Sequence, residues 1–175
     1  MIVSLCGFMG AGKSTIGKFL AKITGYDFID LDLYIQQREH KSIPEIFSLE
    51  GEKGFRQKEL LALQEIINRY TGDCSKNMIL SLGGGTVTEK TCAELIHTCT
   101  RCIYLYCTKE ELARRLKRNT AQRPLLQGKS DSELIEHIAN LMNQREQIYK
   151  SCAHITISTQ EGNLPQIVNN ILNVI

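Results

Sequence analysis

The sequence predicts an α/β fold, in which helices lie on both faces of a five-stranded parallel sheet. Short apolar runs rich in β-favouring residues alternate with amphipathic helical patterns, an order that is typical of parallel sheets. A glycine-rich loop also joins the first apolar run to the first helical pattern, as in α/β proteins that bind nucleotides. The expected strands are 1–5, 27–31, 78–82, 102–107 and 154–158.

The glycine-rich loop reads Gly7-Phe8-Met9-Gly10-Ala11-Gly12-Lys13-Ser14-Thr15, which fits the phosphate-binding pattern G-x-x-x-x-G-K-[ST]. We expect its backbone N–H groups to surround phosphate oxygens at the start of the next helix. Lys13 would reach the β- and γ-phosphates of a nucleoside triphosphate, and the Ser14 hydroxyl would ligate Mg²⁺. In the helix that follows, one face is expected to be buried, formed by Ile16, Phe19, Leu20 and Ile23. The alternative is a glycine turn that only links a strand to a helix.

The other helices have recognisable starts and breaks. Ser42 is a helix cap, with Pro44 in the first turn and Glu45 three residues after the cap. Gly51 interrupts the pattern, and the segment 119–130, which is polar and contains a proline and a glycine, is expected to be a mobile loop. The remaining expected helices span about 32–40, 52–70, 90–98, 109–118, 131–150 and 164–175.

Composition narrows the class of protein. A chain of 175 residues, 42% of them hydrophobic and 23% charged, is expected to form one globular domain. A net charge of +2 does not favour binding to nucleic acid or to a membrane surface. No apolar run approaches the roughly 20 residues of a membrane helix, and a strand at the N-terminus leaves no room for a signal peptide. We therefore expect a cytoplasmic protein.

Cysteines are numerous but scattered. Their count of seven is odd, and we expect reduced thiols rather than a disulfide framework. Cys99 and Cys102 form a C-x-x-C pair, which leaves a zinc or redox role open beside the simpler interpretation of ordinary thiols.

Three motifs follow the carboxyl ends of expected strands: the glycine-rich loop, Asp30-Leu31-Asp32, and Gly83-Gly84-Gly85. Ligands bind outside the carboxyl ends of strands in such sheets, so all three motifs should meet in one cleft. Asp30 and Asp32 share one side of an extended segment, where one could serve a magnesium shell while the other takes a proton from an acceptor hydroxyl. Alternatively, Asp32 simply caps the next helix.

The chain resembles the shikimate kinase family along nearly its whole length. The matching pieces, in order, are the glycine-rich loop, Phe28-Ile29-Asp30-Leu31-Asp32, Ile43-Pro44-Glu45-Ile46-Phe47, Gly51-Glu52, Phe55-Arg56, Glu59, Gly83-Gly84-Gly85, Arg123-Pro124-Leu125-Leu126, Arg145, Glu146 and Tyr149. The resemblance implies a three-layer P-loop kinase fold like that of nucleoside monophosphate kinases, with strand order 2-3-1-4-5. It also implies a single kinase domain over 1–175, with a substrate-binding region at about 32–60 and a mobile lid at about 119–130.

The activity implied by the resemblance is transfer of the γ-phosphoryl group of ATP to the 3-hydroxyl of shikimate. The products would be shikimate 3-phosphate and ADP, in chorismate and aromatic amino acid biosynthesis. Asp32 would contact the substrate hydroxyls as the candidate base, and Asp30 would assist Mg²⁺ through water. Arg56 and Arg145 would hold the substrate carboxylate, with Glu59 orienting Arg56.

The remaining site residues implied by the resemblance belong to loops and to the adenine side. Gly83, Gly84 and Gly85 would let the backbone approach the substrate closely, and Arg123 would move with the lid onto the phosphates. One of Arg114, Arg115 and Arg118 would meet the nucleotide, and we favour Arg115. Asn163 would contact adenine through its backbone or its side chain. From the residues alone, Arg123 could equally be a solvated surface charge, and Arg145 is more simply explained as one. Arg56 opens a helix, where a positive charge conflicts with the helix dipole, and this favours a functional role.

Other functions remain open from the sequence. A kinase for gluconate or for a nucleoside monophosphate would share the glycine-rich loop, and a nucleotide-binding regulator without transfer activity would share it too. The Asp30/Asp32 pair, Arg56 with Glu59, and the triple glycine favour shikimate. A regulatory GTPase should carry an Asn-Lys-x-Asp motif, which the sequence lacks. The expected partners are therefore ATP and shikimate, with no nucleic acid or membrane, and the expected state is a monomer.

Overall fold

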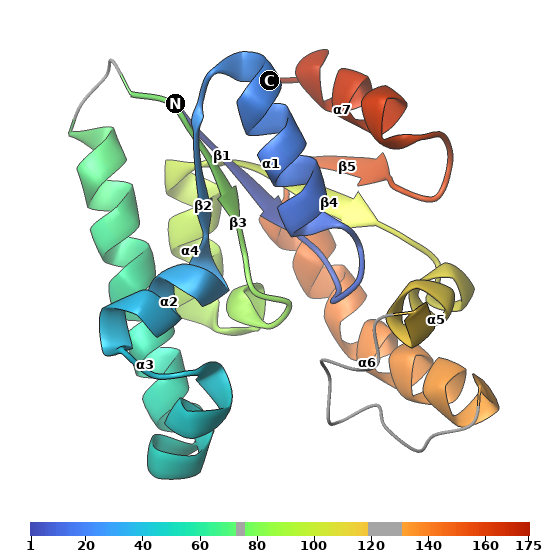
Figure 1. Ribbon diagram of the computed structural model, residues 1–175, viewed down its shortest axis with the longest axis horizontal. Helices are drawn as coiled ribbons and strands as arrows, with labels where there is room; N and C mark the ends of the chain where they lie inside the picture. Colours follow the sequence, from blue (N-terminus) through green and yellow to red (C-terminus); the bar gives the residue numbers. More distant parts are fainter. Residues whose placement is uncertain (73–75, 119–130) are drawn as a thin grey trace.

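The computed structural model describes residues 1–72, 76–118 and 131–175. In these residues five parallel strands form one sheet, in the order β2-β3-β1-β4-β5 (Figure 1). The strands are β1 (Ile2–Cys6), β2 (Asp27–Asp30), β3 (Met78–Ser81), β4 (Arg101–Tyr106) and β5 (Ile155–Ser158). The strand order and the parallel pairing confirm the fold predicted from the sequence.

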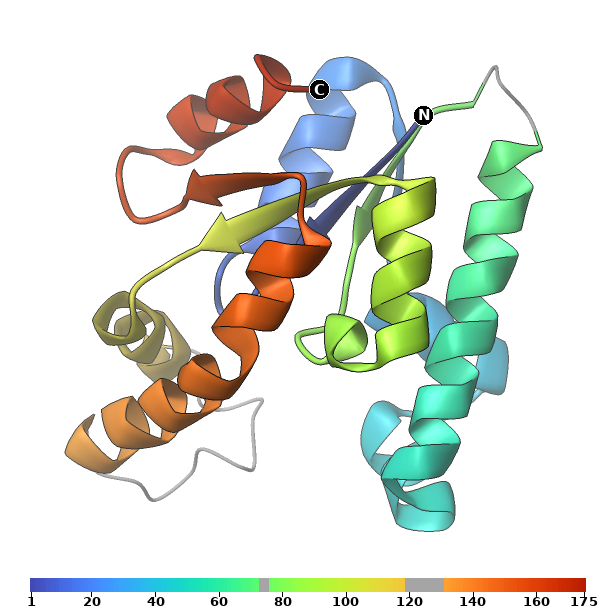
Figure 2. The same ribbon diagram turned by 180° about the vertical axis from the view of Figure 1, so that it is seen from behind.

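Helices cover both faces of this sheet. One face carries α1 (Lys13–Thr24) and α7 (Leu164–Leu172), and the other carries α3 (Ile43–Thr71), α4 (Lys90–Cys99) and α6 (Asp131–Cys152) (Figures 1 and 2). The short helix α2 (Leu31–Glu39) follows β2 and packs against α3. Beyond the carboxyl end of β4, α5 (Lys109–Arg118) packs against α6. A short 3₁₀ helix, η1 (Thr86–Thr88), follows the triple glycine.

The central strand is buried on both sides because helices cover both faces of the sheet. All five residues of β1 are buried, as are all four of β3. The polar Ser4 in β1 is satisfied by a hydrogen bond of 2.7 Å between its hydroxyl and that of Thr100. This rigid centre fixes the loops that leave its carboxyl end, and the glycine-rich loop is the first of them.

Helix α1 corrects one expectation about the core. Ile16 and Leu20 are buried as predicted and Phe19 is half-buried, but Ile23 is 52% exposed. Ile23 lies in the last turn of α1, and Gly25 ends the helix. The surroundings of Gly25 are open, because a Cβ placed on this glycine would have no other atom within 4 Å. The helical period is right, and Ala21 in the last turn is still buried, but the packing surface ends before it reaches Ile23.

Helix α3 confirms both local signals in its sequence. The Ser42 side chain accepts a hydrogen bond from the Glu45 backbone N–H, and the Glu45 carboxylate accepts one from the Ser42 N–H at 2.7 Å. Gly51, with φ of 69°, divides α3 into two helical pieces. At the other end of the chain, α7 stops at Leu172 instead of 175. In the parts of the chain that the structure describes, no helix combines the length and apolar character needed to cross a membrane.

Most described cysteines are packed into the core. Cys6, Cys92, Cys102, Cys107 and Cys152 are buried and carry free thiols, whereas Cys99 is half-buried at the end of α4. A hydrogen bond with Cys102, together with burial, raises the pKa of the Cys152 thiol. Within the described ranges, no three or more His, Cys, Asp or Glu side chains are grouped to hold a metal ion.

Candidate active site

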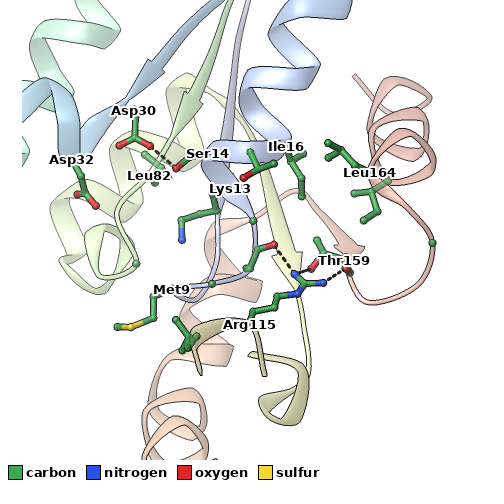
Figure 3. Close-up of a pocket in the computed structure, with 18 residues that line it drawn as sticks. Met9, Lys13, Ser14, Ile16, Asp30, Asp32, Leu82, Arg115, Thr159 and Leu164 are labelled. Atoms are coloured by element: carbon green, nitrogen blue, oxygen red, sulfur yellow. Dashed lines mark hydrogen bonds between the residues drawn. The ribbon is translucent and has the colours of Figure 1, made fainter. Parts of the chain in front are cut away.

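A cavity of about 710 Å³ opens at the carboxyl ends of the central strands (Figure 3). Its walls come from the glycine-rich loop, the ends of β2 and β3, helix α5, and the segment from β5 to α7. The lining residues are Met9, Gly10, Ala11, Gly12, Lys13, Ser14, Thr15, Ile16, Asp30, Asp32, Leu82, Gly84, Arg115, Leu116, Thr159, Gly162, Leu164 and Ile167.

The three sequence motifs meet in this cavity, as predicted. Lys13, Asp32 and Gly84 all border it, although they follow three different strands. Figure 3 shows Asp30, Asp32 and Lys13 toward one end and Arg115, Thr159 and Leu164 toward the other. The cavity therefore has an acidic end and an end formed by α5 and the start of α7.

The glycine-rich loop needs its glycines for both conformation and space. Gly7, Gly10 and Gly12 have φ values of 138°, 86° and 97°, which side-chain-bearing residues rarely adopt. A Cβ on Gly7 would also come within 2.7 Å of the Leu105 carbonyl oxygen in the neighbouring β4. The Lys13 ammonium donates to the carbonyl oxygens of Gly7 and Phe8, at 2.8 and 3.0 Å, and so stays folded along the loop.

Ser14 and Asp30 form the part of the site that suits a magnesium ion. The Ser14 hydroxyl donates to an Asp30 carboxylate oxygen at 2.6 Å and lies 3.3 Å from the Ser81 hydroxyl. Hydroxyl and carboxylate oxygens are the donors that Mg²⁺ prefers, so the residues present fit this ion.

The capping alternative for Asp32 is wrong, because Asp30 has that position. Asp30 is the N-cap of α2 and accepts from the Leu33 N–H at 3.3 Å. The helix consequently starts at Leu31, one residue earlier than expected, and Asp32 lies inside its first turn. The Asp32 side chain is free of the cap and borders the cavity.

Asp32 has the properties of a proton acceptor near neutral pH. Burial raises the pKa of its carboxyl from 3.8 to about 6, and the negative charges of Asp30 and Glu59 act in the same direction. Lys13 and Arg56 oppose this increase without cancelling it. Ionised at pH 7 yet basic for a carboxylate, Asp32 is suited to accept a proton from a hydroxyl group.

Arg56 is held beside the triple glycine by a buried carboxylate. Glu59 is 1% exposed, and it accepts from the Arg56 guanidinium and from the Thr86 hydroxyl, both at 2.6 Å. A Cβ on Gly83 would lie 2.8 Å from the Asp32 carboxylate, and one on Gly85 would lie 2.6 Å from the Arg56 guanidinium. The glycines are thus needed for close approach, and Glu59 orients Arg56 as the sequence analysis expected.

Arg115 lies at the end of the cavity opposite the acidic residues, and Arg114 does not. The Arg115 guanidinium donates to the Thr159 carbonyl at 2.6 Å and to Glu111 at 2.7 Å. Glu111 also binds Arg114, which is 53% exposed, and the hydrogen bonds from Arg114 and Arg115 lower the pKa of Glu111 to about 2. The side chain of Arg118 is outside the description.

Several described residues of the predicted site do not line the cavity: Arg56, Glu59, Gly83, Gly85, Arg145 and Asn163. Asn163 is exposed and caps α7, where its side-chain oxygen accepts from the Gln166 N–H at 3.1 Å. Its backbone is also engaged, because its N–H donates to the Gln166 side chain at 2.8 Å and its carbonyl accepts from the Ile167 N–H at 3.1 Å. Its neighbours Gly162 and Leu164 line the cavity instead. Arg123 and the expected lid at 119–130 lie outside the described residues, and their roles stay predictions.

Sequence reasoning assigned no role to Tyr149, Glu111 or Thr159. The Tyr149 hydroxyl donates to the Gly84 carbonyl at 2.5 Å. Burial raises the pKa of Tyr149, and Arg145, one helical turn earlier, is close enough to oppose this rise. The spacing of Glu111 to the two arginines, three and four residues, was visible in the sequence as a helical ion pair. The contacts of Tyr149 and Thr159 carried no such local signal.

Comparisons with known proteins agree with this geometry. A family model described as shikimate kinase matches residues 9–175. The chain belongs to the shikimate kinase family. A shikimate kinase of Chlorobium chlorochromatii is 38% identical over 175 residues, covering 97% of this chain and 88% of the relative. One from Parabacteroides distasonis is 37% identical over 173 residues, covering 99% and 96%.

Solved structures of the shikimate kinase family share the fold over nearly the whole chain. The crystal structure of shikimate kinase from Bacteroides thetaiotaomicron matches with a TM-score of 0.90 and 32% identity, covering 99% of this chain and 97% of that one. Shikimate kinase from Acinetobacter baumannii, solved in complex with shikimate, matches with a TM-score of 0.84 and 34% identity, covering 99% and 91%.

Proposed function

We propose that the protein transfers the γ-phosphoryl group of ATP to the 3-hydroxyl of shikimate, giving shikimate 3-phosphate and ADP. The observation that carries this proposal is that the phosphate-binding loop, a buried carboxylate with a raised pKa and Gly84 of the triple glycine, 83–85, called the glycine loop below, border one cavity. Membership of the shikimate kinase family supports this choice of acceptor over gluconate or a nucleoside monophosphate.

Each end of the cavity has its own part in the reaction. The triphosphate lies in the loop Gly10–Thr15, with Lys13 turning from the loop carbonyls to the β- and γ-phosphates. Ser14, with Asp30 acting through water, would hold Mg²⁺, which would neutralise phosphate charge when it is bound. Arg115 borders the nucleotide at the far end, and a contact of Asn163 with the nucleotide would have to compete with the hydrogen bonds of its helix cap.

The chemical step takes place beside Asp32. The acceptor hydroxyl oxygen forms a bond to the γ-phosphorus as the bond to the bridging oxygen of ADP breaks, and Asp32 takes the hydroxyl proton. Arg56 and Arg145 bind the acceptor carboxylate, since paired guanidinium donors match a carboxylate's two oxygens. The backbone of Gly83, Gly84 and Gly85 completes the acceptor end.

A coupled assay of ADP release tests the proposal. Shikimate should give the highest kcat/KM when it is compared with gluconate and nucleoside monophosphates at equal ATP and Mg²⁺. Lys13→Ala should lose most of this turnover, because its charge is most useful as negative charge moves on the transferring group. Equal or faster ADP release with gluconate or a nucleoside monophosphate would overturn the assignment of the acceptor.

We also propose that the chain acts as a single kinase domain, as a monomer in the cytoplasm, with its acceptor-binding region at about 32–60. Sedimentation equilibrium of the purified protein tests the monomer. A mass near 19.8 kDa is expected, and a mass near twice that value would contradict it.

A further inference from the structure

Tyr149 ties helix α6 to the glycine loop at the acceptor end of the cavity. Its hydroxyl donates a hydrogen bond of 2.5 Å to the carbonyl oxygen of Gly84, which lines the cavity beside Asp32. The side chain is 1% exposed, so water does not compete for this bond. Among the described residues, this is the side-chain hydrogen bond that holds the Gly84 peptide group.

The tyrosine is itself held rigidly. Its ring stacks on that of Tyr104 in β4, with ring centroids 5.2 Å apart and an angle of 20° between the planes. Burial raises the pKa of Tyr149 to about 12, so the hydroxyl remains a donor throughout the working pH range. The central sheet, through Tyr104, therefore sets the position of the hydroxyl.

This bond fixes the direction of a peptide group that no other side chain of the described residues holds by a hydrogen bond. The Gly84–Gly85 peptide is trans, since the described chain contains no cis bonds, so its C=O and N–H point in opposite directions. Holding the carbonyl toward α6 turns the Gly85 N–H away from α6. A run of three glycines could otherwise rotate readily, because no Cβ restricts it.

Arg145 strengthens the connection between the loop and the acceptor. It lies four residues before Tyr149 on α6, and residues four apart share a helix face. One face of α6 thus carries both a proposed carboxylate anchor and the tether of the glycine loop. A shift of either one relative to the other would misplace the acceptor.

We propose that Tyr149 is a positioning residue that holds the Gly84 peptide group in the orientation needed to bind the acceptor. This proposal rests on the proposed function, in which the glycine loop contacts shikimate. It assigns Tyr149 no contact with the nucleotide and no part in proton transfer.

Tyr149→Phe removes the hydroxyl and keeps the stacked ring. We expect the KM for shikimate to rise roughly 10-fold, the loss expected for one buried hydrogen bond, while the KM for ATP stays within about twofold of the wild type. Amide hydrogen exchange at 83–86 should become faster, which reports the loosened loop directly and does not depend on activity.

Tyr104→Phe is the matched control. It removes a buried hydroxyl from the other ring of the same stack, and among the described residues no hydrogen bond joins that hydroxyl to Gly83, Gly84 or Gly85, whereas Tyr149 bonds Gly84. It should leave the KM for shikimate and exchange at 83–86 unchanged, whatever its effect on the melting temperature.

The outcomes separate the two proposals. If wild-type protein does not phosphorylate shikimate, the proposed function fails and the role of Tyr149 fails with it. If wild-type protein is active but Tyr149→Phe keeps a normal KM for shikimate, only the positioning role is overturned. A Tyr149→Phe variant that changes both KM values equally, or that behaves like Tyr104→Phe, would also overturn it, since a purely structural role predicts those results.

Discussion

The surroundings that make Asp32 a good proton acceptor also lower the stability of the fold. Its carboxylate is buried and faces two other acidic groups, so the folded protein holds its negative charge less readily than the unfolded chain does. A pKa raised from 3.8 to about 6 means that the folded state binds more protons between these values. Stability linked to Asp32 therefore falls as pH rises through this window and stays reduced above pH 6.

Asp32→Asn should consequently be more stable than the wild type but inactive. A shift of about two pKa units corresponds to roughly 3 kcal/mol, so we expect a gain of up to that size in the free energy of unfolding at pH 7.5. The gain should shrink as pH is lowered below 6, where the wild-type carboxyl is protonated. Urea unfolding at several pH values measures it, and a variant less stable than the wild type at pH 7.5 would contradict this account.

Arg56 should act mainly in binding the acceptor. Arg56→Ala is expected to raise the KM for shikimate by at least 10-fold, because a buried charge-assisted contact is lost, while the KM for ATP changes little. Arg69→Ala is the matched control, since Arg69 lies on the same helix but is 54% exposed and pairs only at 3.8 Å with Glu65. Steady-state kinetics with a normal KM for shikimate in Arg56→Ala would exclude the role.

For individual residues, the sequence predicted those roles that depend on residues nearby in the chain. The phosphate-binding loop is a contiguous pattern, and the Ser42 cap needs only Glu45, so both were visible. The choice of Arg115 over Arg114 depends on Thr159, which is 44 residues away along the chain. Tyr149 donates a hydrogen bond to Gly84, which is 65 residues away along the chain, and the local sequence around neither residue indicates that bond.

At the level of the elements, the pairing of β4 with β5, called the β4–β5 edge below, begins with a side chain that accepts a hydrogen bond from the backbone of β4. The His154 N–H donates to the Cys102 carbonyl at 2.8 Å, and the Cys102 N–H donates to Nδ1 of the His154 ring at 3.1 Å. The ring stacks on His97, with centroids 4.6 Å apart, and Arg101 lies near it. Burial, His97 and Arg101 all lower the pKa of His154 below 6.5, because each disfavours its charged form.

This edge should weaken in acid. A lowered pKa means that the unfolded chain binds the proton more readily, so stability is complete above pH 6.5 and is lost as pH falls through the lower folded value. Protonation of Nδ1 also puts two donors face to face. When pH is lowered from 7.5 to 5, the melting temperature of the wild type should fall by about 2 °C more than that of His154→Asn, as measured by thermal unfolding. The asparagine amide oxygen accepts the same hydrogen bond but does not titrate. Parallel losses in both proteins would rule out this histidine as the cause.

Element types were predictable while some ends were not. Strand and helix patterns gave all five strands, and Gly51 correctly marked the break in α3. The start of α2 shifted because Asp30 rather than Asp32 caps it, and two acidic residues so close together offer the same local signal. Ile23 was misjudged because a helical period cannot tell where the opposing surface stops.

For the whole molecule, the cavity spans the sheet from β2 to the segment after β5, so its two ends can be altered separately. Glu111→Gln loosens Arg115 at the end opposite Asp32 and should raise the KM for ATP several-fold while leaving the KM for shikimate within about twofold. It should also reduce the gain in melting temperature that ADP produces.

Glu94→Gln is the control for Glu111→Gln, because Glu94 forms an exposed pair with Lys90 at 3.8 Å on α4. It should match the wild type in both KM values and in the response to ADP. A Glu111→Gln variant that binds ADP as the wild type does would show that the Arg115 pairing is unimportant for the nucleotide.

The buried thiols make the molecule a natural subject for labelling experiments. Of the six described cysteines, five are buried and only Cys99 is half-buried. Among these six, an alkylating reagent should therefore modify Cys99 first, and the thiols on β1, β4 and α6 only in molecules whose sheet has opened. The rate at which these later adducts appear, measured by mass spectrometry, would report the rate of global unfolding without a dye, a tag or a mutation.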